Sequence, residues 1–227
     1  MDQNQIYDLQ TIEVMKRALK NGGNCVDVGC HTGVMMDEML AISPNGTHWG
    51  FEPLPDLFQG LAKKYRGVAN VKILNVALSE APGTVSFQHV VSNPGYSGLR
   101  KRRYDRPDEV IQSITVSTAM LDDVIPESSS VEFIKIDVEG AELQVFRGAM
   151  KTISRCRPVI VFEHGLGAAD HYGTEPEDVF DLLTNSCGLR CFTMENWLSG
   201  NGANALGRDQ FCDEFKSGRN YYFMAAQ

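Results

Sequence analysis

The strongest constraint on the fold comes from the segment Cys25–Gly33, which reads Cys-Val-Asp-Val-Gly-Cys-His-Thr-Gly. It begins as a short apolar strand, passes an acidic residue and ends in a glycine turn. The apolar positions after Gly33 follow helical spacing. A strand that turns through glycine into a helix brings backbone N–H groups and a helix N-terminus to one point. The segment therefore predicts a site for an anionic ligand group such as a carboxylate or phosphate.

Two ligands compete for this loop. A dinucleotide site requires G-x-G-x-x-G, in which the middle glycine lets a pyrophosphate approach the backbone. Here Gly29 and Gly33 are separated by Cys30, His31 and Thr32, so the middle glycine is missing. Asp27 would repel a pyrophosphate but attract an ammonium group, and the methionine end of S-adenosylmethionine carries both an ammonium and a carboxylate. The alternative without a ligand is a buried strand followed by an ordinary turn.

Composition narrows the class of protein. The 227 residues are enough for one α/β domain with a full core. A net charge of −8 argues against general nucleic-acid binding. The chain shows no apolar run of membrane-spanning length and no signal-peptide pattern at its start, so we expect a cytoplasmic protein. The six cysteines show no spacing typical of zinc, which fits reduced, mostly buried thiols.

One basic run departs from the acidic average. It comprises Arg100, Lys101, Arg102 and Arg103, with Arg106 close behind. Two interpretations stay open: a solvated loop, or an anchor for an anionic part of a substrate.

Strand and helix patterns alternate along much of the chain. This alternation predicts an α/β fold with a mostly parallel sheet and right-handed crossovers. The expected strands are 24–28, 48–51, 71–76, 131–137, 158–163, 189–194 and 221–225, and the expected helices are 6–19, 33–42, 54–65, 140–150 and 174–185.

We expect a single domain over residues 1–227, with an N-terminal helix in residues 1–22. The alternation breaks over residues 84–117, where two β-like stretches flank a long irregular loop. This β insertion is the predicted substrate cover, because long loops in compact domains are often lids or binding loops.

Carboxylates end several of the expected strands. In open α/β sheets the ligand lies beyond the carboxyl ends of the strands. Asp27, Glu52, Asp137 and Glu163 should therefore gather at one edge, where they require a cationic ligand or a metal ion. Glu52 follows the glycine loop by about twenty residues, where nucleotide-binding folds place a carboxylate for ribose hydroxyls. A solvated acid before Pro53 is the alternative for Glu52.

Together these motifs resemble the FkbM family of S-adenosylmethionine-dependent O-methyltransferases. The resemblance rests on 26–33, 51–53, 75–79, 121–123 and the block Phe-Ile-Lys-Ile-Asp-Val-Glu-Gly-Ala-Glu at 133–142. It implies a Rossmann-like sheet of seven strands with helices on both faces and the last strand antiparallel. One departure is Cys30-His31-Thr32, where the family usually has small or amide residues; the glycines and Asp27 are intact.

The resemblance also implies roles for the donor site. Asp27 and the loop of Gly29, Cys30, His31, Thr32 and Gly33 would hold the methionine end of S-adenosylmethionine. Glu52, with Pro53, would take the ribose hydroxyls, and Val76 and Ala77 would lie against adenine. Asp137 would face the methyl group and the acceptor.

Transfer to an alcohol is helped by a base within hydrogen-bond reach. The candidates are His164, Asp137, Glu139 and Glu163. His164 follows a strand end and has a suitable intrinsic pKa, although a loop histidine without a chemical role is equally compatible. Lys135 should point to the same side of its strand as Asp137, either in catalysis or in a purely structural ion pair.

A divalent metal ion held by Asp137, Glu163 and His164 is an alternative way to activate the acceptor. No spacing motif supports it, so it is not favoured.

The resemblance points to an acceptor hydroxyl on a sugar or glycan, or on a natural-product scaffold such as a polyketide. Tyr96, Arg100, Arg102 and His164 are the expected acceptor contacts, and the basic run fits an anionic acceptor. Two other functions stay open: a non-catalytic S-adenosylmethionine-binding protein, and an NAD-dependent oxidoreductase, which the missing middle glycine disfavours.

Overall fold

The computed structural model describes residues 2–19, 22–200 and 202–227. Its main sheet has seven strands in the order β3-β2-β1-β7-β8-β10-β9. Only β10 runs antiparallel to its two neighbours, so the α/β fold class with an antiparallel last strand is confirmed. The strands of this sheet are β1 (Cys25–Val28), β2 (His48–Phe51), β3 (Val71–Leu74), β7 (Phe133–Ile136), β8 (Val159–Glu163), β9 (Arg190–Thr193) and β10 (Tyr222–Ala226).

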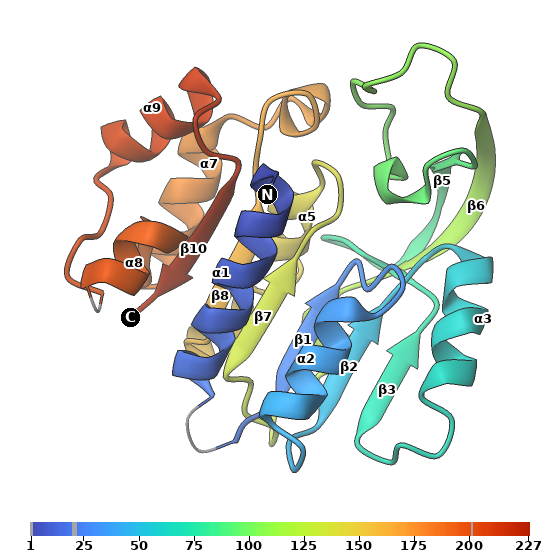
Figure 1. The fold of residues 1–227 in the computed structure, drawn as a ribbon, viewed down its shortest axis with the longest axis horizontal. Helices are drawn as coiled ribbons and strands as arrows, with labels where there is room; N and C mark the ends of the chain where they lie inside the picture. Colours follow the sequence, from blue (N-terminus) through green and yellow to red (C-terminus); the bar gives the residue numbers. More distant parts are fainter. Residues whose placement is uncertain (1, 20–21, 201) are drawn as a thin grey trace.

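Helices cover both faces of the sheet (Figure 1). One face packs against α1 (Gln3–Ala18), α2 (Val34–Ile42) and α8 (Met194–Gly200). The other packs against α5 (Glu142–Arg147), α6 (Met150–Cys156), α7 (Pro176–Asp181) and α9 (Arg208–Ser217). Because both faces are covered, the central strands are apolar at nearly every position and fully buried. Within the described residues, no helix is both long and apolar enough to cross a membrane.

The strand order reverses direction between β1 and β7. From β1 the chain builds outward through β2 to β3, and it later returns to place β7 on the other side of β1. Helices leave the carboxyl ends of these two strands on opposite faces, so a crevice opens between the ends. Ligands of open α/β sheets bind at such a switch point.

The insertion forms a small second sheet beside the main one, drawn in green in Figure 1. Its order is β4-β6-β5, with β4 (Ala77–Leu78), β5 (Gly83–Val90) and β6 (Ile111–Ala119). A short 3₁₀ turn, η1 (Pro94–Tyr96), lies in the connection between β5 and β6. The stretch expected to end the third strand is divided: β3 stops at Leu74, and Ala77–Leu78 pairs with β6 instead.

Several helix boundaries differ from the sequence expectation. The helix expected over 140–150 is the shorter α5, which ends at Arg147 because Gly148 packs directly on the Ser79 carbonyl; a further helix, α6, follows from Met150. The helix expected over 174–185 changes after α7 into a π-helical turn, Leu182–Ser186. The sequence shows no clear helical spacing of apolar residues in the short α4 (Leu121–Val124), in α8 or in α9. The helix expected over 54–65 is α3 (Pro55–Lys64). Residues 1, 20 and 21 of the expected N-terminal segment lie outside the described residues.

Candidate active site

A cavity of about 330 Å³ lies at the switch point, within the size range of small-ligand sites. The carboxyl ends of β1, β2 and β7 form its floor, and the insertion forms one wall. Most residues predicted to bind the methyl donor line this cavity: Asp27, Gly29, Cys30, His31, Thr32, Glu52, Pro53, Val76, Ala77 and Asp137. The predicted catalytic residues Lys135 and Glu139 line it as well. Gly33, Tyr96, Arg100, Arg102 and His164 are not among its lining residues.

The glycine loop is held against both neighbouring strand ends. The N–H groups of Gly29 and Cys30 donate to the Phe51 carbonyl at 3.0 and 3.1 Å. Gly29 has a positive φ of 82°, and a Cβ built there would lie 1.9 Å from the Asp137 carbonyl oxygen. Only glycine fits such a close approach between loops.

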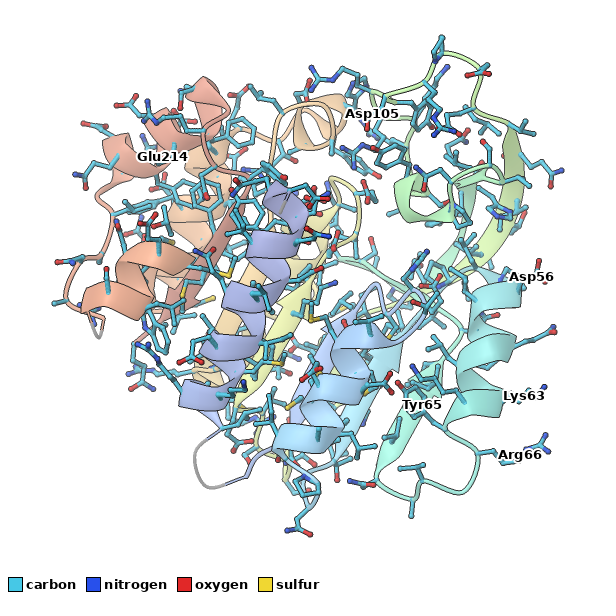
Figure 2. All side chains as sticks on the ribbon, in the orientation of Figure 1. Asp56, Lys63, Tyr65, Arg66, Asp105 and Glu214 are labelled. Carbon is cyan, nitrogen blue, oxygen red and sulfur yellow. The ribbon has the colours of Figure 1, made fainter. Side chains whose placement is uncertain are left out.

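The turn into α2 is stabilised from the next helix along the chain. Gly33 caps α2 in the left-handed region, with φ 77°. Tyr65, labelled in Figure 2, follows α3 and donates its hydroxyl hydrogen bond to the Gly33 carbonyl at 2.9 Å. Gly33 therefore shapes the predicted loop from behind, which explains why it is absent from the cavity lining.

Asp27 is the most unusual group in the cavity. It is 0% exposed, and neither carboxylate oxygen has a hydrogen-bond partner within the described residues. The nearest cation, the Lys135 ammonium, lies 4.0 Å from Oδ1. Burial raises the pKa of Asp27, and Lys135 offsets this only in part. A buried carboxylate without donors is costly, so this position is prepared for a cationic, hydrogen-bonding ligand group.

Lys135 links Asp27 to Asp137. Lys135 is the register partner of Asp27 across β1 and β7, so the two side chains share one face of the sheet. Its ammonium lies 3.2 Å from Asp137 Oδ2, and the Tyr222 hydroxyl donates to the same oxygen at 2.7 Å. Burial alone would raise the pKa of Asp137, but Lys135 and Tyr222 outweigh it and hold the pKa below its usual value. Asp137 is therefore an ionised carboxylate whose Oδ2 is engaged by both partners.

Glu52 is hydrogen-bonded to the backbone of the glycine loop that it faces. Its Oε2 accepts from the His31 N–H at 2.8 Å, and its Oε1 accepts from the Leu54 N–H at 2.9 Å. Burial raises the pKa of Glu52 to about 7, against the lowering effect of these two hydrogen bonds. Each carboxylate oxygen has a further lone pair, so Glu52 can accept ligand hydroxyl groups as well.

Three carboxyl groups gather where β7 and β8 end, and two of them, Asp137 and Glu139, line the cavity. Oxygens of Asp137, Glu139 and Glu163 lie within 4.8 Å of one another. Burial, then the charge of Asp137, raises the pKa of Glu163 well above its usual value and so favours its neutral form. The alternative metal set of Asp137, Glu163 and His164 does not come together, since Glu139 and not His164 completes the group.

His164 lies outside the cavity, contrary to its expected position as base or acceptor contact. It directly follows β8, and its ring stacks on Phe215 at 4.5 Å between centroids. It is 1% exposed, and burial lowers its pKa to about 3. A neutral ring packed among aromatic side chains of α9 cannot reach a ligand at the switch point.

The basic run binds the protein itself. Arg102 forms an ion pair with Glu139, and its guanidinium lies 4.9 Å from the Tyr96 ring centroid. The backbone N–H of Arg103 donates to the Gly167 carbonyl at 2.8 Å, and that of Arg100 to the Tyr172 hydroxyl at 2.9 Å. The run therefore docks the insertion onto the body of the protein, and of its members Arg102 comes closest to the cavity.

Several lining residues carried no signal in the sequence. They come from α1, from α2 and from the insertion: Asp8, Val34, Met35, Phe87, Pro94, Gly95, Ser97 and Leu99. The long irregular loop pointed to the insertion as a whole, but not to these positions. Tyr222 reaches Asp137 because β10 is antiparallel and sets Tyr222 opposite Glu163. A pairing of this kind cannot be inferred from spacing.

Glu142 is the structural acid of the Lys-Ile-Asp-Val-Glu-Gly-Ala-Glu block. Its Oε1 accepts from the N–H groups of Gly140 and Val138 at 3.0 and 3.3 Å, and burial raises its pKa to about 7. We expect Glu142→Ala to lower the free energy of unfolding by about 1–3 kcal/mol, because both buried donors lose their acceptor. Urea denaturation measures this change.

Glu142→Gln is the matched control, because its amide oxygen can accept both hydrogen bonds without a charge. A folded-state pKa of about 7, above the ordinary 4.5, means that wild-type stability from this group is lost as pH rises between these values. The glutamine variant should therefore match wild type near pH 4.5 and exceed it at pH 8. Equal loss in the alanine and glutamine variants would contradict the assigned role.

Solved structures define the class of fold. The crystal structure of methyltransferase FkbM from Methylobacillus flagellatus KT superposes with a TM-score of 0.54 at 14% identity, over 90% of this chain and 43% of that chain. This likeness shows a shared Rossmann-like methyltransferase fold. The sequence then identifies the family: residues 27–191 match the methyltransferase FkbM domain, so the chain belongs to the FkbM methyltransferase family. The predicted resemblance is confirmed.

Two curated relatives carry names that describe an activity. The hexuronic acid methyltransferase AglP of Haloferax volcanii is 30% identical over 164 residues, which cover 70% of this chain and 61% of the relative. The 2-O-methyltransferase NoeI of Sinorhizobium fredii is 26% identical over 151 residues, which cover 58% of this chain and 59% of the relative. The chain thus spans about three fifths of the length of these relatives.

Proposed function

We propose that this protein is an S-adenosylmethionine-dependent O-methyltransferase whose acceptor is a hydroxyl group of a sugar or glycan. The observation that carries the proposal is the buried carboxylate of Asp27 at the floor of the switch-point cavity, which has no hydrogen-bond partner among the described residues, with Glu52 at the next strand end. The Asp27 carboxylate is suited to an ammonium group, and the Glu52 carboxylate is suited to a pair of ribose hydroxyls. Membership of the FkbM family supports the same donor.

The residues present fit the donor. Asp27 would accept from the ammonium, and the positive N-terminal end of α2 would favour the ligand carboxylate. Glu52 would accept from the ribose hydroxyls, and Val76 and Ala77 offer apolar surface for adenine. The donor supplies a methyl carbon already activated by its sulfonium. The protein must then align an acceptor oxygen with that carbon and take up its proton.

Among the predicted bases, Glu139 is best suited to receive the proton. Asp137 is engaged by Lys135 and Tyr222, and the raised pKa of Glu163 favours its protonated form. Glu139 lines the cavity and pairs with a single residue, Arg102, in the part of the chain that the structure describes. Asp137 would accept a hydrogen bond from the acceptor and orient it.

The acceptor class rests on the relatives. AglP is named for a hexuronic acid, which is a sugar, and NoeI for 2-O-methyl transfer, so the two names together support a sugar acceptor methylated on oxygen. The insertion wall, with Phe87, Pro94 and Leu99, gives the apolar surface on which a sugar ring can lie. A hydroxylated natural-product scaffold is the wider class to include in a test.

Two measurements test the proposal. Calorimetry with S-adenosylhomocysteine and NAD should show binding of the first and none of the second. Radiolabelled methyl transfer from S-adenosylmethionine to a panel of sugars, uronic acids and hydroxylated polyketides should label a sugar. Donor binding without labelling of any acceptor would favour a non-catalytic binder, and NAD binding alone would overturn the proposal.

Donor affinity should depend on pH through Glu52. The carboxylate form accepts ribose hydroxyls best, and the pKa of Glu52 is about 7, so the ionised fraction rises about tenfold between pH 6 and pH 8. We expect the Kd for S-adenosylhomocysteine to fall by about tenfold over this range, as measured by calorimetry. Glu52→Gln should bind more weakly and with a flatter profile. An equal slope in both proteins would remove Glu52 as the titrating group.

A further inference from the structure

The insertion closes on the acceptor end of the cavity through one buried ion pair. Arg102 belongs to the insertion and Glu139 to the loop after β7, and each side chain is only 14% exposed. Glu139 lines the cavity, and so do Pro94 and Gly95 of the insertion. The Glu139 carboxylate thus connects the Arg102 guanidinium to the cavity wall.

The charges around this pair are balanced elsewhere. Lys135 and Tyr222 engage Asp137, and burial raises the pKa of Glu163, which favours its neutral form. The anion that balances Arg102 is consequently Glu139, a residue held in the left-handed region at φ 59°. Such a conformation is strained for a side chain with a Cβ and is typical of functional loops.

The Arg102 guanidinium has an N–H donor without an acceptor among the described residues. Its Nε is buried without a hydrogen-bond partner among the described residues, although arginine offers five N–H donors. The Tyr96 ring supports its flat face at 4.9 Å. A rigid, supported guanidinium with a free edge is the geometry that binds a carboxylate through two parallel hydrogen bonds.

We propose that Arg102 is the specificity residue for a carboxylate-bearing acceptor, a uronic acid sugar, whose carboxylate replaces that of Glu139 on the guanidinium. This inference rests on the proposed methyl transfer to a sugar hydroxyl and deepens it. This exchange also removes the counterion of Glu139. Glu139 then becomes a stronger base beside the acceptor hydroxyl than it is when paired with Arg102.

The resulting step balances. The acceptor oxygen forms a bond to the methyl carbon while the bond from that carbon to sulfur breaks, and its electron pair stays on sulfur. The hydroxyl proton passes to the Glu139 carboxylate. The acceptor charge thus compensates the positive charge that the donor brings into the cavity, and a neutral sugar would leave Glu139 paired and less basic.

Two probes that differ in one group test the inference: methyl β-D-glucuronide and methyl β-D-glucoside. Both are titrated into the complex with S-adenosylhomocysteine, and kcat/KM is measured for each with S-adenosylmethionine. Wild type should bind the glucuronide at least tenfold more tightly. Arg102→Gln should reduce this preference below twofold, and Arg102→Lys should retain part of it.

Two further variants act as controls. Arg102→Gln combined with Glu139→Gln leaves no buried charge unpaired, so it stays folded if the single variant does not, and it should also lose the preference. Arg66→Gln removes an exposed arginine beyond α3, labelled in Figure 2, and should keep the preference.

The outcomes separate this inference from the proposed function. Equal binding of both probes to wild type, or a preference that persists without Arg102, overturns the inference. Methylation of both probes at equal efficiency overturns it while supporting the function. The expected binding pattern without methyl transfer supports the inference and counts against the function.

Discussion

Asp27→Asn is expected to weaken binding of S-adenosylhomocysteine by about 100-fold, although the fold is retained. Within the described residues neither oxygen of the buried carboxylate accepts a hydrogen bond, and its nearest cation is the Lys135 ammonium at 4.0 Å, so we expect it to receive the ligand ammonium. A charge-assisted hydrogen bond of this kind contributes about 1.5–3 kcal/mol, and each 1.4 kcal/mol is tenfold in affinity. Calorimetry measures the loss. Methylthioadenosine has no amino-acid group, so its affinity should be the same in wild type and variant.

The same substitution should leave the ligand-free protein as stable as wild type or more so. Burial raises the pKa of Asp27, so the folded state favours its neutral form, and stability is lost as pH rises above the ordinary value near 3.8. Asparagine removes that loss, and its advantage in thermal unfolding should be larger at pH 8 than at a pH below 3.8. A variant that loses stability and binds both ligands poorly would show that Asp27 is structural.

Gly29→Ala is expected to lower the free energy of unfolding by about 2–5 kcal/mol. A left-handed backbone costs a residue with a Cβ about 1–2 kcal/mol, and overpacking adds about 1–3 kcal/mol. Both apply at Gly29, where φ is 82° and the Cβ would meet the Asp137 carbonyl oxygen at 1.9 Å. Relief of this contact would push apart the ends of β1 and β7, so donor binding should be lost as well.

Gly67→Ala is the matched control. Gly67 has a similar φ of 86°, but nothing lies within 4 Å of the position its Cβ would take. Urea denaturation should give a loss of only about 1–2 kcal/mol, the cost of conformation alone. The difference between the two variants measures the contact between the strand ends. Equal losses would mean that the loops can separate freely.

The residues proposed to bind the methyl donor were predictable from the sequence because their signals are local. Asp27, Glu52 and Asp137 each end a strand, and the carboxyl ends of adjacent parallel strands must meet. The alternation of apolar strands and helices specified which strands are parallel, and the glycine spacing excluded a close pyrophosphate. The cavity accordingly contains nearly all predicted donor residues.

The acceptor side was not readable, because its contacts join segments that are remote in the chain. His164 follows a strand end like Asp137 does, yet it packs into the aromatic cluster beneath α9, a helix without a clear pattern. The basic run was interpreted as solvated or as an open anion anchor. Its true partners, Glu139, Gly167 and Tyr172, are far away in sequence.

The amino-acid sequence alone thus predicted the α/β class, the family and the strand ends proposed for the methyl donor, since backbone periodicity, glycine turns and strand-end charges are short-range properties. Tertiary packing settled which carboxylates are free and which are paired. Asp27 is buried and accepts no hydrogen bond within the described residues. Asp137 is engaged by Lys135 and Tyr222, and Glu139 faces Arg102. Charge and pKa depend on every neighbour within a few ångströms, and those neighbours come together only when the insertion folds over the sheet.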